Sequence, residues 1–412
     1  MATFHLINDG KKCTELHLEV HHALYDALSM GMILRDLEAA YTGKPLSEGP
    51  EFHSWISHIE TLDMSAPKAF WRGLLLGASM PYLVPPVPGA MRGYQLNGRS
   101  TVCVSSQNLK LPFGTLSSVV KASWSILLSV ALGIRDVVFG EVSANRYLPF
   151  PGIHMVKGPC VNLVPVRARL DSNMTLNSLV HQIQELSTAG MPYHHLGVGS
   201  IIESCTNWPR WTRFSSAIAF QNHNEIHATW TFGEAEAALL TDGEPGDSTD
   251  IYLIAFPGAK NLEIDIRYSP QVFTLKQIEW IRQVFAKILE IYCDNPDKTL
   301  AQAGNSLHEA FGPYEIPQLE QPTSGYENGC FRSVSPKSMN LVMQAWKDVG
   351  LSIKEQRPDT TIWDCGANIV NCFLLSEYFR DAGYDITTDD IVRNPSWHQL
   401  ARHIESQSQI KD

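Results

Sequence analysis

The segment His21-His22-Ala23-Leu24-Tyr25-Asp26-Ala27-Leu28-Ser29 joins two stretches whose hydrophobic patterns differ. Before it, apolar residues at 16, 18 and 20 alternate with polar residues, which is the period-two pattern of a half-buried strand. After it, Met32, Ile33, Leu37 and Ala40 recur at helical spacing, and this pattern ends near Gly43. The sequence therefore predicts paired histidines at the end of a strand, with Asp26 in the turn before a helix.

A histidine four positions before an aspartate is one arrangement that supports acid–base chemistry. Imidazole has an unperturbed pKa near neutrality, so it suits proton transfer, while the carboxylate can fix the local structure or pair with a cation. Adjacent histidines at a strand end point to opposite faces, so only one of them lines a given channel. The pattern also arises by chance, and on this segment alone a solvent-facing or core histidine stays an open alternative.

The rest of the chain interleaves strands and helices, which predicts an α+β fold. Helical patterns cover 51–78, 116–132, 176–186 and 275–292, and strand patterns cover 101–104, 136–142, 163–170, 215–220, 252–256 and 262–268. Proline and glycine are concentrated at 80–98, which predicts a loop at a lobe boundary, and again at 301–335, which predicts a linker. Residues 336–403 then form a separate helical pattern.

Composition excludes several classes of protein. Of 412 residues, 44% are hydrophobic and 18% charged, and the net charge of −11 argues against a general nucleic-acid binder. No apolar run is long enough to span a membrane, and no signal peptide precedes residue 18. Eight cysteines without CxxC spacing indicate free thiols in a reducing compartment, so we expect a cytoplasmic protein. The histidines lack metal-ligand spacing, and we expect no metal.

Further segments carry a resemblance to a known family. The string from His21 to Asp26 resembles the HHxxxDG motif of condensation domains of nonribosomal peptide synthetases, in a form typical of fungi. Ser143-Ala144-Asn145-Arg146 resembles the segment with the family's arginine, and 158–167 (GPCVNLVPVR) resembles its GPxxNxxPxR segment. Tyr193-His194-His195 and the stretch from Phe214 to Asn222 resemble two later segments. These five segments follow the family's order over residues 1–295.

The resemblance implies a two-lobed, chloramphenicol-acetyltransferase-like fold with a tunnel between the lobes. It implies a partial N-terminal lobe at 1–95, a C-terminal lobe at 96–300, a linker at 301–335 and a carrier-like helical bundle at 336–412. Carrier domains would deliver pantetheine-bound donor and acceptor to the tunnel.

The resemblance also implies roles for single residues. His22 would position or deprotonate the acceptor amine, and Asp26 would pair with Arg146 to hold the motif loop. His21 would be mainly structural. Gly158, Pro159 and Asn162 would lie near the lobe interface.

Three departures from the family are visible. Ala27 replaces the usual glycine, the family's tryptophan-containing DFGWG segment is not recognisable near 250–257, and the hydrophobic pattern gives one strand before the paired histidines. A full domain of this family has more of its N-terminal lobe upstream, so we expect an incomplete lobe with uncovered sheet edges and core faces.

Residues 336–405 resemble a thiolation (carrier) domain, through 361–369 (TIWDCGANI) and 384–391 (YDITTDDI). Asn368 stands where such domains have the serine that accepts phosphopantetheine. A carboxamide lacks the hydroxyl nucleophile, so we expect a degenerate carrier unit with no covalently bound cofactor. Substrates would arrive on the 4′-phosphopantetheine of partner carrier domains. No adenylation signature is present, so upstream carrier and adenylation domains are the expected partners.

Three other functions stay open from the sequence. A stand-alone HxxxD acyltransferase would use coenzyme A thioesters, although the carrier-like tail argues against it. An epimerisation domain shares the paired histidines. A catalytically inactive docking remnant would keep folded interfaces but make no bonds.

Overall fold

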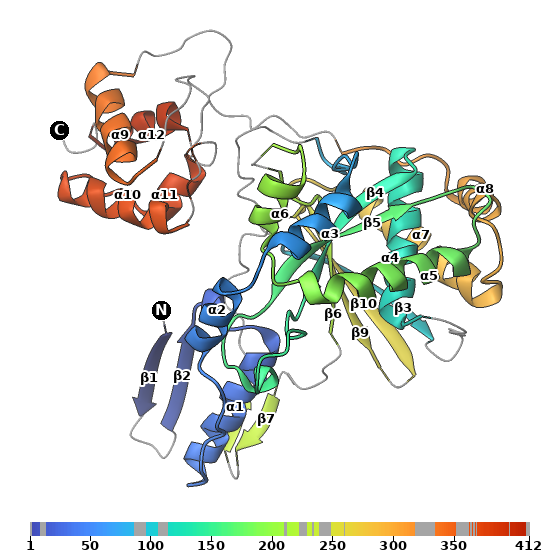
Figure 1. The fold of residues 1–412 in the computed structure, drawn as a ribbon, viewed down its shortest axis with the longest axis horizontal. Helices are drawn as coiled ribbons and strands as arrows, with labels where there is room; N and C mark the ends of the chain where they lie inside the picture. Colours follow the sequence, from blue (N-terminus) through green and yellow to red (C-terminus); the bar gives the residue numbers. More distant parts are fainter. Residues whose placement is uncertain are drawn as a thin grey trace.

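A six-stranded mixed sheet forms the centre of the larger part of the computed structural model (Figure 1). Its strands are β3 (Gly98–Ser105), β4 (Asp136–Ser143), β5 (Asn162–Arg169), β6 (Ser216–Phe220), β9 (Ile251–Pro257) and β10 (Asn261–Tyr268). Their order is β3-β10-β9-β6-β4-β5, and β6 pairs in parallel with both β4 and β9 while the other pairs are antiparallel. This order brings together strands that are far apart in the sequence.

The structure describes most of the chain. The described residues are 2–8, 14–85, 96–105, 114–209, 212–221, 229–232, 235–238, 249–258, 260–317, 334–351, 362, 365, 367, 369–394 and 396–408.

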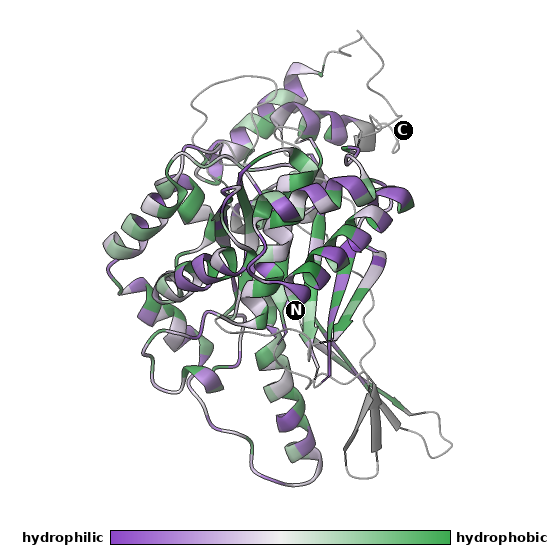
Figure 2. Ribbon diagram, turned by 90° about the vertical axis from the view of Figure 1, so that its right-hand side faces the viewer, coloured by the Kyte–Doolittle hydropathy of each residue, from purple (hydrophilic) through white to green (hydrophobic). Residues whose placement is uncertain are grey.

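Helices cover both faces of the sheet. α4 (Leu116–Leu132), α5 (Leu176–Gly190), α7 (Leu275–Asp294) and α8 (Leu300–Phe311) share the largest hydrophobic core, while α3 (Ser65–Leu75) and α6 (Val198–Cys205) pack near β4 and β5 around a second core. Successive residues of β4 enter different cores, with Phe139 in the first and Val138 in the second. A strand buried on both faces has a continuous apolar run. Figure 2 shows hydrophobic residues on the inner strands and hydrophilic residues on the outer helix faces.

Local signals fix the ends of the long helices. Thr115 caps α4 by accepting a hydrogen bond from the Ser118 amide, and Gly133, at φ +66°, ends it in the left-handed conformation that glycine adopts freely. Thr274 and Gln277 form a capping box at the start of α7. The predicted helices at 116–132 and 275–292 are confirmed within two residues.

The N-terminal part contains the hairpin β1 (Ala2–Asn8) and β2 (Thr14–Val20), the 3₁₀ turn η1 (His22–Leu24), α1 (Ala27–Tyr41) and α2 (Phe52–Glu60). Two strands therefore precede the paired histidines, and the prediction of one strand is wrong. In the hairpin register Phe4 lies opposite Leu18 and Leu6 opposite Leu16, so one face is apolar. Phe4 is 64% exposed and Leu6 is 73% exposed. A contiguous apolar surface of this kind is typical of a contact surface.

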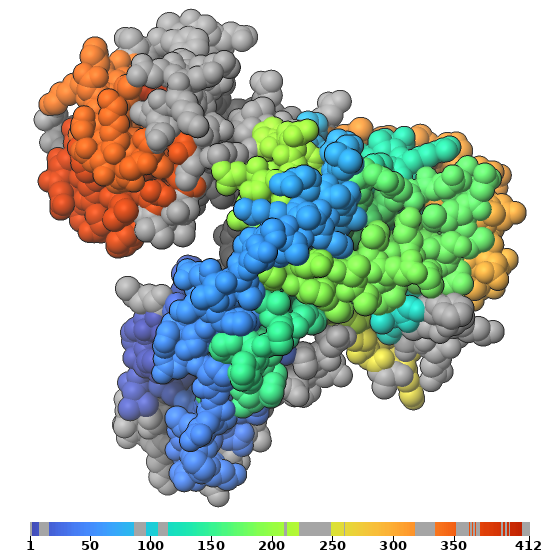
Figure 3. Space-filling model, in the orientation of Figure 1, coloured from blue at the N-terminus to red at the C-terminus, as the bar shows by residue number. Residues whose placement is uncertain are grey.

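The predicted division at residue 95 does not follow the packing. α3, predicted in the N-terminal lobe, packs on the sheet through Trp71. Conversely, the segment 144–160, which includes η3 (Ile153–Met155), packs against α2, because Val156 and Cys160 belong to the same buried hydrophobic cluster as Trp55. In Figure 3 the teal-green surface of this segment lies beside the blue surface of α1 and α2. The chain therefore crosses between the two parts more than once, and residues 86–95 lie outside the described residues.

The predicted linker is wrong at its start. Residues 301–311 belong to α8, which begins with a capping box of Thr299 and Gln302 and buries Ala303 and Leu307 in the largest core. The capping and the buried face outweigh the glycine and polar residues that suggested a linker. Residues 318–333 of the predicted linker lie outside the described residues.

The C-terminal unit has a core of its own. It consists of α9 (Pro336–Asp348), α10 (Ile369–Asp381), α11 (Thr388–Arg393) and α12 (Trp397–Ser408), packed around Trp346, Leu375 and Phe379. The predicted helical pattern of this region is confirmed.

The remaining short elements are η4 (Met191–Tyr193), β7 (Thr229–Phe232) and β8 (Ala235–Ala238), the last two forming a separate ladder. None of the described helices has the length and apolar character to cross a membrane.

Candidate active site

Asp26 is a buried carboxylate at the start of α1. Its side chain is 1% exposed, and Oδ1 accepts a hydrogen bond of 2.7 Å from the Ser29 amide while the Ser29 hydroxyl accepts one from the Asp26 amide. Oδ2 also accepts 3.0 Å hydrogen bonds from the Cys160 amide and from Arg146. These contacts satisfy a charge that would otherwise be costly to bury.

Arg146 pairs with Asp26 across 120 positions of sequence. Its side chain is 6% exposed, and its Nη1 donates 2.8 Å hydrogen bonds to the carbonyls of Ile153 and Val156. Nη2 contacts both oxygens of Asp26 and the Gly158 carbonyl. The pairing expected from the sequence is present, and the guanidinium additionally shapes the loop that follows it.

His22 stands in the turn that Asp26 anchors. β2 ends at Val20, His21 is extended and caps the 3₁₀ turn by accepting from the Ala23 amide, and His22 begins that turn. The strand alternation expected for the pair therefore stops before it reaches His22. The His22 ring is exposed, stacks on Tyr25 with centroids 4.6 Å apart, and places Nδ1 3.3 Å from the Tyr25 carbonyl oxygen.

That carbonyl selects a tautomer of His22. A carbonyl oxygen only accepts, so Nδ1 carries the hydrogen in this contact. The neutral ring then has an unprotonated Nε2, which is able to accept a proton. Within the described part of the chain Nε2 has no hydrogen-bond partner.

The residues expected near the lobe interface lie on the segment that leads into β5. A Cβ on Gly158 would meet the Phe52 ring of α2 at 2.4 Å, so only glycine fits there, and Pro159 follows it before Cys160. The Asn162 side-chain amide donates to the His194 carbonyl at 2.7 Å and to the Leu196 carbonyl at 2.9 Å. Gly158 thus contacts the N-terminal part, while Asn162 ties β5 to the 194–196 turn.

His194 supports the turn that leads to Arg146. Its Nδ1 lies 2.7 Å from the Ser143 hydroxyl at the end of β4, and that oxygen accepts from the Asn145 amide. Asn145 has φ +51°, a left-handed conformation that asparagine tolerates better than most residues. Sequence reasoning missed this contact because Ser143 and His194 are 51 positions apart.

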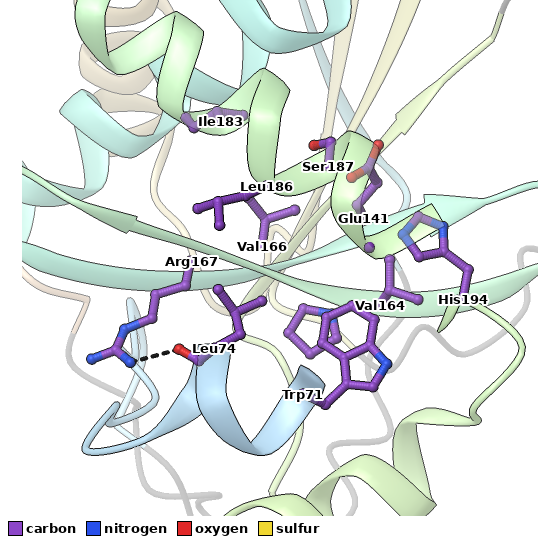
Figure 4. Close-up of a pocket in the computed structure, with 12 residues that line it drawn as sticks. Trp71, Leu74, Glu141, Val164, Val166, Arg167, Ile183, Leu186, Ser187 and His194 are labelled. Atoms are coloured by element: carbon purple, nitrogen blue, oxygen red, sulfur yellow. Dashed lines mark hydrogen bonds between the residues drawn. The ribbon is translucent and has the colours of Figure 1, made fainter. Parts of the chain in front are cut away.

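A buried ion pair lies close to His194. Lys121 of α4 is 3% exposed and donates to both oxygens of Glu141 on β4, at 3.0 and 3.1 Å, and to the Ser187 hydroxyl at 2.8 Å. Glu141, Ser187 and His194 line a space of about 20 Å³. Trp71 and Leu74 also line this space, and Figure 4 shows how these side chains lie around it. That volume holds about one water molecule. In the sequence, Lys121 stands within an apolar helix pattern and Glu141 within an apolar strand pattern. A charged residue at each of these buried positions is the signal that could have indicated the pair.

The environment fixes the charge states of two side chains at this site. Burial lowers the pKa of His194 to about 4, an effect that Glu141 opposes and Lys121 reinforces, so the ring is neutral near pH 7. Burial raises the pKa of the Cys160 thiol to about 11, which makes it a poor nucleophile despite its position beside Asp26.

Asn368 lies outside the described residues, directly before α10 in the sequence. Ser376, the nearest serine along α10, is 2% exposed and donates to the Phe373 carbonyl at 2.7 Å. In the described ranges, no three histidine, cysteine or acidic side chains gather as a metal site would require.

Comparisons with known proteins place this architecture in one class. The model of the condensation domain family matches residues 1–306. The nonribosomal peptide synthetase valB of Aspergillus terreus is 35% identical over 73% of this chain, and nonribosomal peptide synthetase 6 of Cochliobolus miyabeanus is 22% identical over 96% of it. The chain spans 12% and 24% of these two proteins.

A solved structure shares the fold. The starter condensation domain of rhizomide synthetase, in complex with C8-CoA, superposes with a TM-score of 0.57 at 19% identity, over 70% of this chain and 68% of that one. The predicted α+β, chloramphenicol-acetyltransferase-like fold class is therefore confirmed. Residues 1–306 carry the family's pattern, and the chain belongs to the condensation domains of nonribosomal peptide synthetases.

The Asp26–Arg146 pair predicts a large stability effect. Arg146→Met leaves the Asp26 carboxylate buried without its cation, so we expect the free energy of unfolding to fall by about 3–5 kcal/mol. Urea denaturation measures this. Arg282→Ala, which breaks the exposed pair with Glu279, is the control and changes stability by about 1 kcal/mol or less. An equally small effect of Arg146→Met would contradict the role given to the pair.

The low pKa of His194 predicts a pH-dependent stability. An unfolded histidine titrates near pH 6.5, and the folded ring titrates at about 4, so between these values the unfolded chain binds the extra proton. The contribution of the neutral His194 ring to the free energy of unfolding is complete above pH 6.5. This contribution is lost as the pH falls towards 4. From about pH 7.5 to about pH 5, wild type should lose about 2 kcal/mol more than His194→Asn. The same loss of stability in wild type and in His194→Asn would refute this prediction. His154 is exposed, so His154→Asn serves as the control.

Proposed function

We propose that this chain forms amide (or ester) bonds between carrier-bound aminoacyl or peptidyl thioesters, as a condensation domain. The observation that carries the proposal is the turn at His22. Asp26 fixes this turn through Arg146, the Ser29 amide and the Cys160 amide, while the His22 ring stays exposed with a free Nε2. A rigid loop that presents an exposed base matches general acid–base chemistry.

In the proposed reaction an acceptor amine attacks the carbonyl carbon of a donor thioester. A C–N bond forms, the C–S bond breaks, and the departing thiolate takes a proton. His22 Nε2 positions the amine or removes its proton. Most of the acceleration comes from holding two tethered reactants together. The partners are upstream carrier and adenylation domains, whose carriers bring the substrates on 4′-phosphopantetheine.

We further propose that the C-terminal unit is a degenerate carrier domain. The relative from Cochliobolus miyabeanus aligns over 96% of this chain, which includes much of this unit. Asn368 at the attachment position has no hydroxyl, and the buried Ser376 hydroxyl is already hydrogen-bonded, so neither can accept the group. The cytoplasmic location expected from the sequence stays a prediction.

Substitution of His22 tests the proposed chemistry. His22→Ala and His22→Asn should each lower amide formation by roughly 10²–10⁴-fold, because neither side chain supplies an imidazole base. Product is measured by mass spectrometry with a carrier-bound donor and an aminoacyl thioester acceptor. The matched control is His21→Asn, whose side-chain oxygen can still accept from the Ala23 amide. Unchanged turnover in His22→Ala would contradict the role of His22 in proton transfer. An inactive wild-type chain would favour the alternative that the chain is a catalytically inactive docking remnant.

Treatment with coenzyme A and a phosphopantetheinyl transferase tests the degenerate carrier. The wild-type chain should gain no mass, whereas an Asn368→Ser variant should gain one phosphopantetheine. A separate active carrier domain verifies the reagents. Loading of the wild-type chain would overturn this part of the proposal.

A further inference from the structure

Tyr25 connects the anchor of the His22 turn to the His22 ring. It directly follows the 3₁₀ turn η1 and directly precedes Asp26, whose side chain is buried. The Tyr25 amide donates to the His22 carbonyl at 3.3 Å, and the Tyr25 carbonyl oxygen lies 3.3 Å from His22 Nδ1. One residue therefore joins the carboxylate that fixes the turn to the imidazole that the turn presents.

The geometry of the turn places the Tyr25 ring against the His22 ring. In a 3₁₀ helix, side chains three residues apart are eclipsed. The two ring centroids are 4.6 Å apart and the ring planes differ by 20°, which is a stacked arrangement at a distance where aromatic rings attract. Tyr25 is half-buried whereas His22 is exposed, so the tyrosine is the fixed partner of the pair.

The orientation of the His22 ring depends on this residue. Within the described part of the chain, the His22 side chain makes no hydrogen bond, ion pair or ring contact other than those with Tyr25. An exposed histidine without such contacts samples three staggered χ1 wells and a broad range of χ2. A stacked aromatic pair favours its own rotamer by about two- to tenfold.

The stacked rotamer also sets the tautomer of His22. In this rotamer Nδ1 faces the Tyr25 carbonyl, which keeps the hydrogen on Nδ1 and leaves Nε2 unprotonated. A ring that turns away loses this contact and exchanges between its two neutral tautomers. The Tyr25 ring thus controls both the direction of the imidazole and the nitrogen that is able to accept a proton.

We infer that Tyr25 is a positioning residue, whose ring stacks on His22 and keeps Nε2 presented as the unprotonated nitrogen. The inference rests on the proposed function, in which Nε2 meets the acceptor amine. The aromatic ring carries this role and the hydroxyl does not. Phenylalanine therefore replaces Tyr25, whereas leucine and serine do not.

Nitrogen NMR of the full chain, labelled with ¹⁵N-histidine, tests the hold on His22 without catalysis. Spectra are recorded at about pH 8.5, well above the ordinary pKa of an exposed histidine. The His22 signals are those that disappear in His22→Asn. Wild type and Tyr25→Phe should show the well-separated shifts of a protonated Nδ1 and an unprotonated Nε2. In Tyr25→Leu and Tyr25→Ser the two shifts should move towards each other, because the tautomers exchange.

The amide-formation assay used for His22 measures the consequence. Tyr25→Leu and Tyr25→Ser should each lower kcat by about three- to tenfold with little change in KM, because a smaller fraction of His22 is competent. Tyr25→Phe should turn over as wild type does. The matched control is Tyr41→Leu, because Tyr41 is 64% exposed at the end of α1 and should affect neither measurement. Urea denaturation verifies that each variant is folded, and the two truncated variants guard against the loss of one.

Three results would overturn the inference: wild-type shifts in both truncated variants, an unchanged kcat in both, or a loss in Tyr25→Phe as large as that in Tyr25→Leu. The last result would assign the role to the hydroxyl. The outcome is separable from the proposed function. If wild type forms no amide but the His22 shifts respond to loss of the Tyr25 ring, the proposed function fails and the hold on His22 stands. If amide formation depends on His22 but neither the shifts nor kcat respond to that loss, the inference fails alone.

Discussion

The buried ion pair of Asp26 and Arg146 is the constraint on which the rest of the site depends. Each partner would be destabilising alone, because a charge removed from water needs full compensation. Together they join the start of α1 to the loop after β4, and the remaining donors of Arg146 hold the carbonyls of Ile153, Val156 and Gly158. One guanidinium therefore organises both the loop and the turn that presents His22.

The central sheet fixes the position of the Asp26–Arg146 pair. Arg146 follows β4 by a few residues, and the Ser143–His194 contact and the left-handed Asn145 set the direction in which the chain leaves that strand. Asn162 holds the beginning of β5 to the same 194–196 turn. Strand ends held in this way position a site more accurately than free loops do.

The sequence predicted the local parts of this arrangement better than the distant ones. The helix signals around 116–132 and the strand signals around 136–142 depend on neighbouring residues, and the structure has both. α8 was missed because its glycine and polar residues resemble a linker, although the spacing of Thr299 and Gln302 indicated a helix start. The His194–Ser143 contact depends on the tertiary fold, which brings the turn at 191–194 to the end of β4, and the spacing of residues along the chain does not encode it.

The separation of Asp26 and Arg146 also orders events during synthesis of the chain. The two residues are 120 positions apart, and ribosomes add about 5–20 residues per second. The aspartate therefore leaves the peptidyl transferase centre about 6–24 s before its partner is made. Through that interval α1 has its capping carboxylate but not its cation, and the loop from 153 to 160 does not yet exist. The turn that presents His22 is thus made before the strand β4 and gains its full set of contacts only after β4 and the loop that follows it have been made.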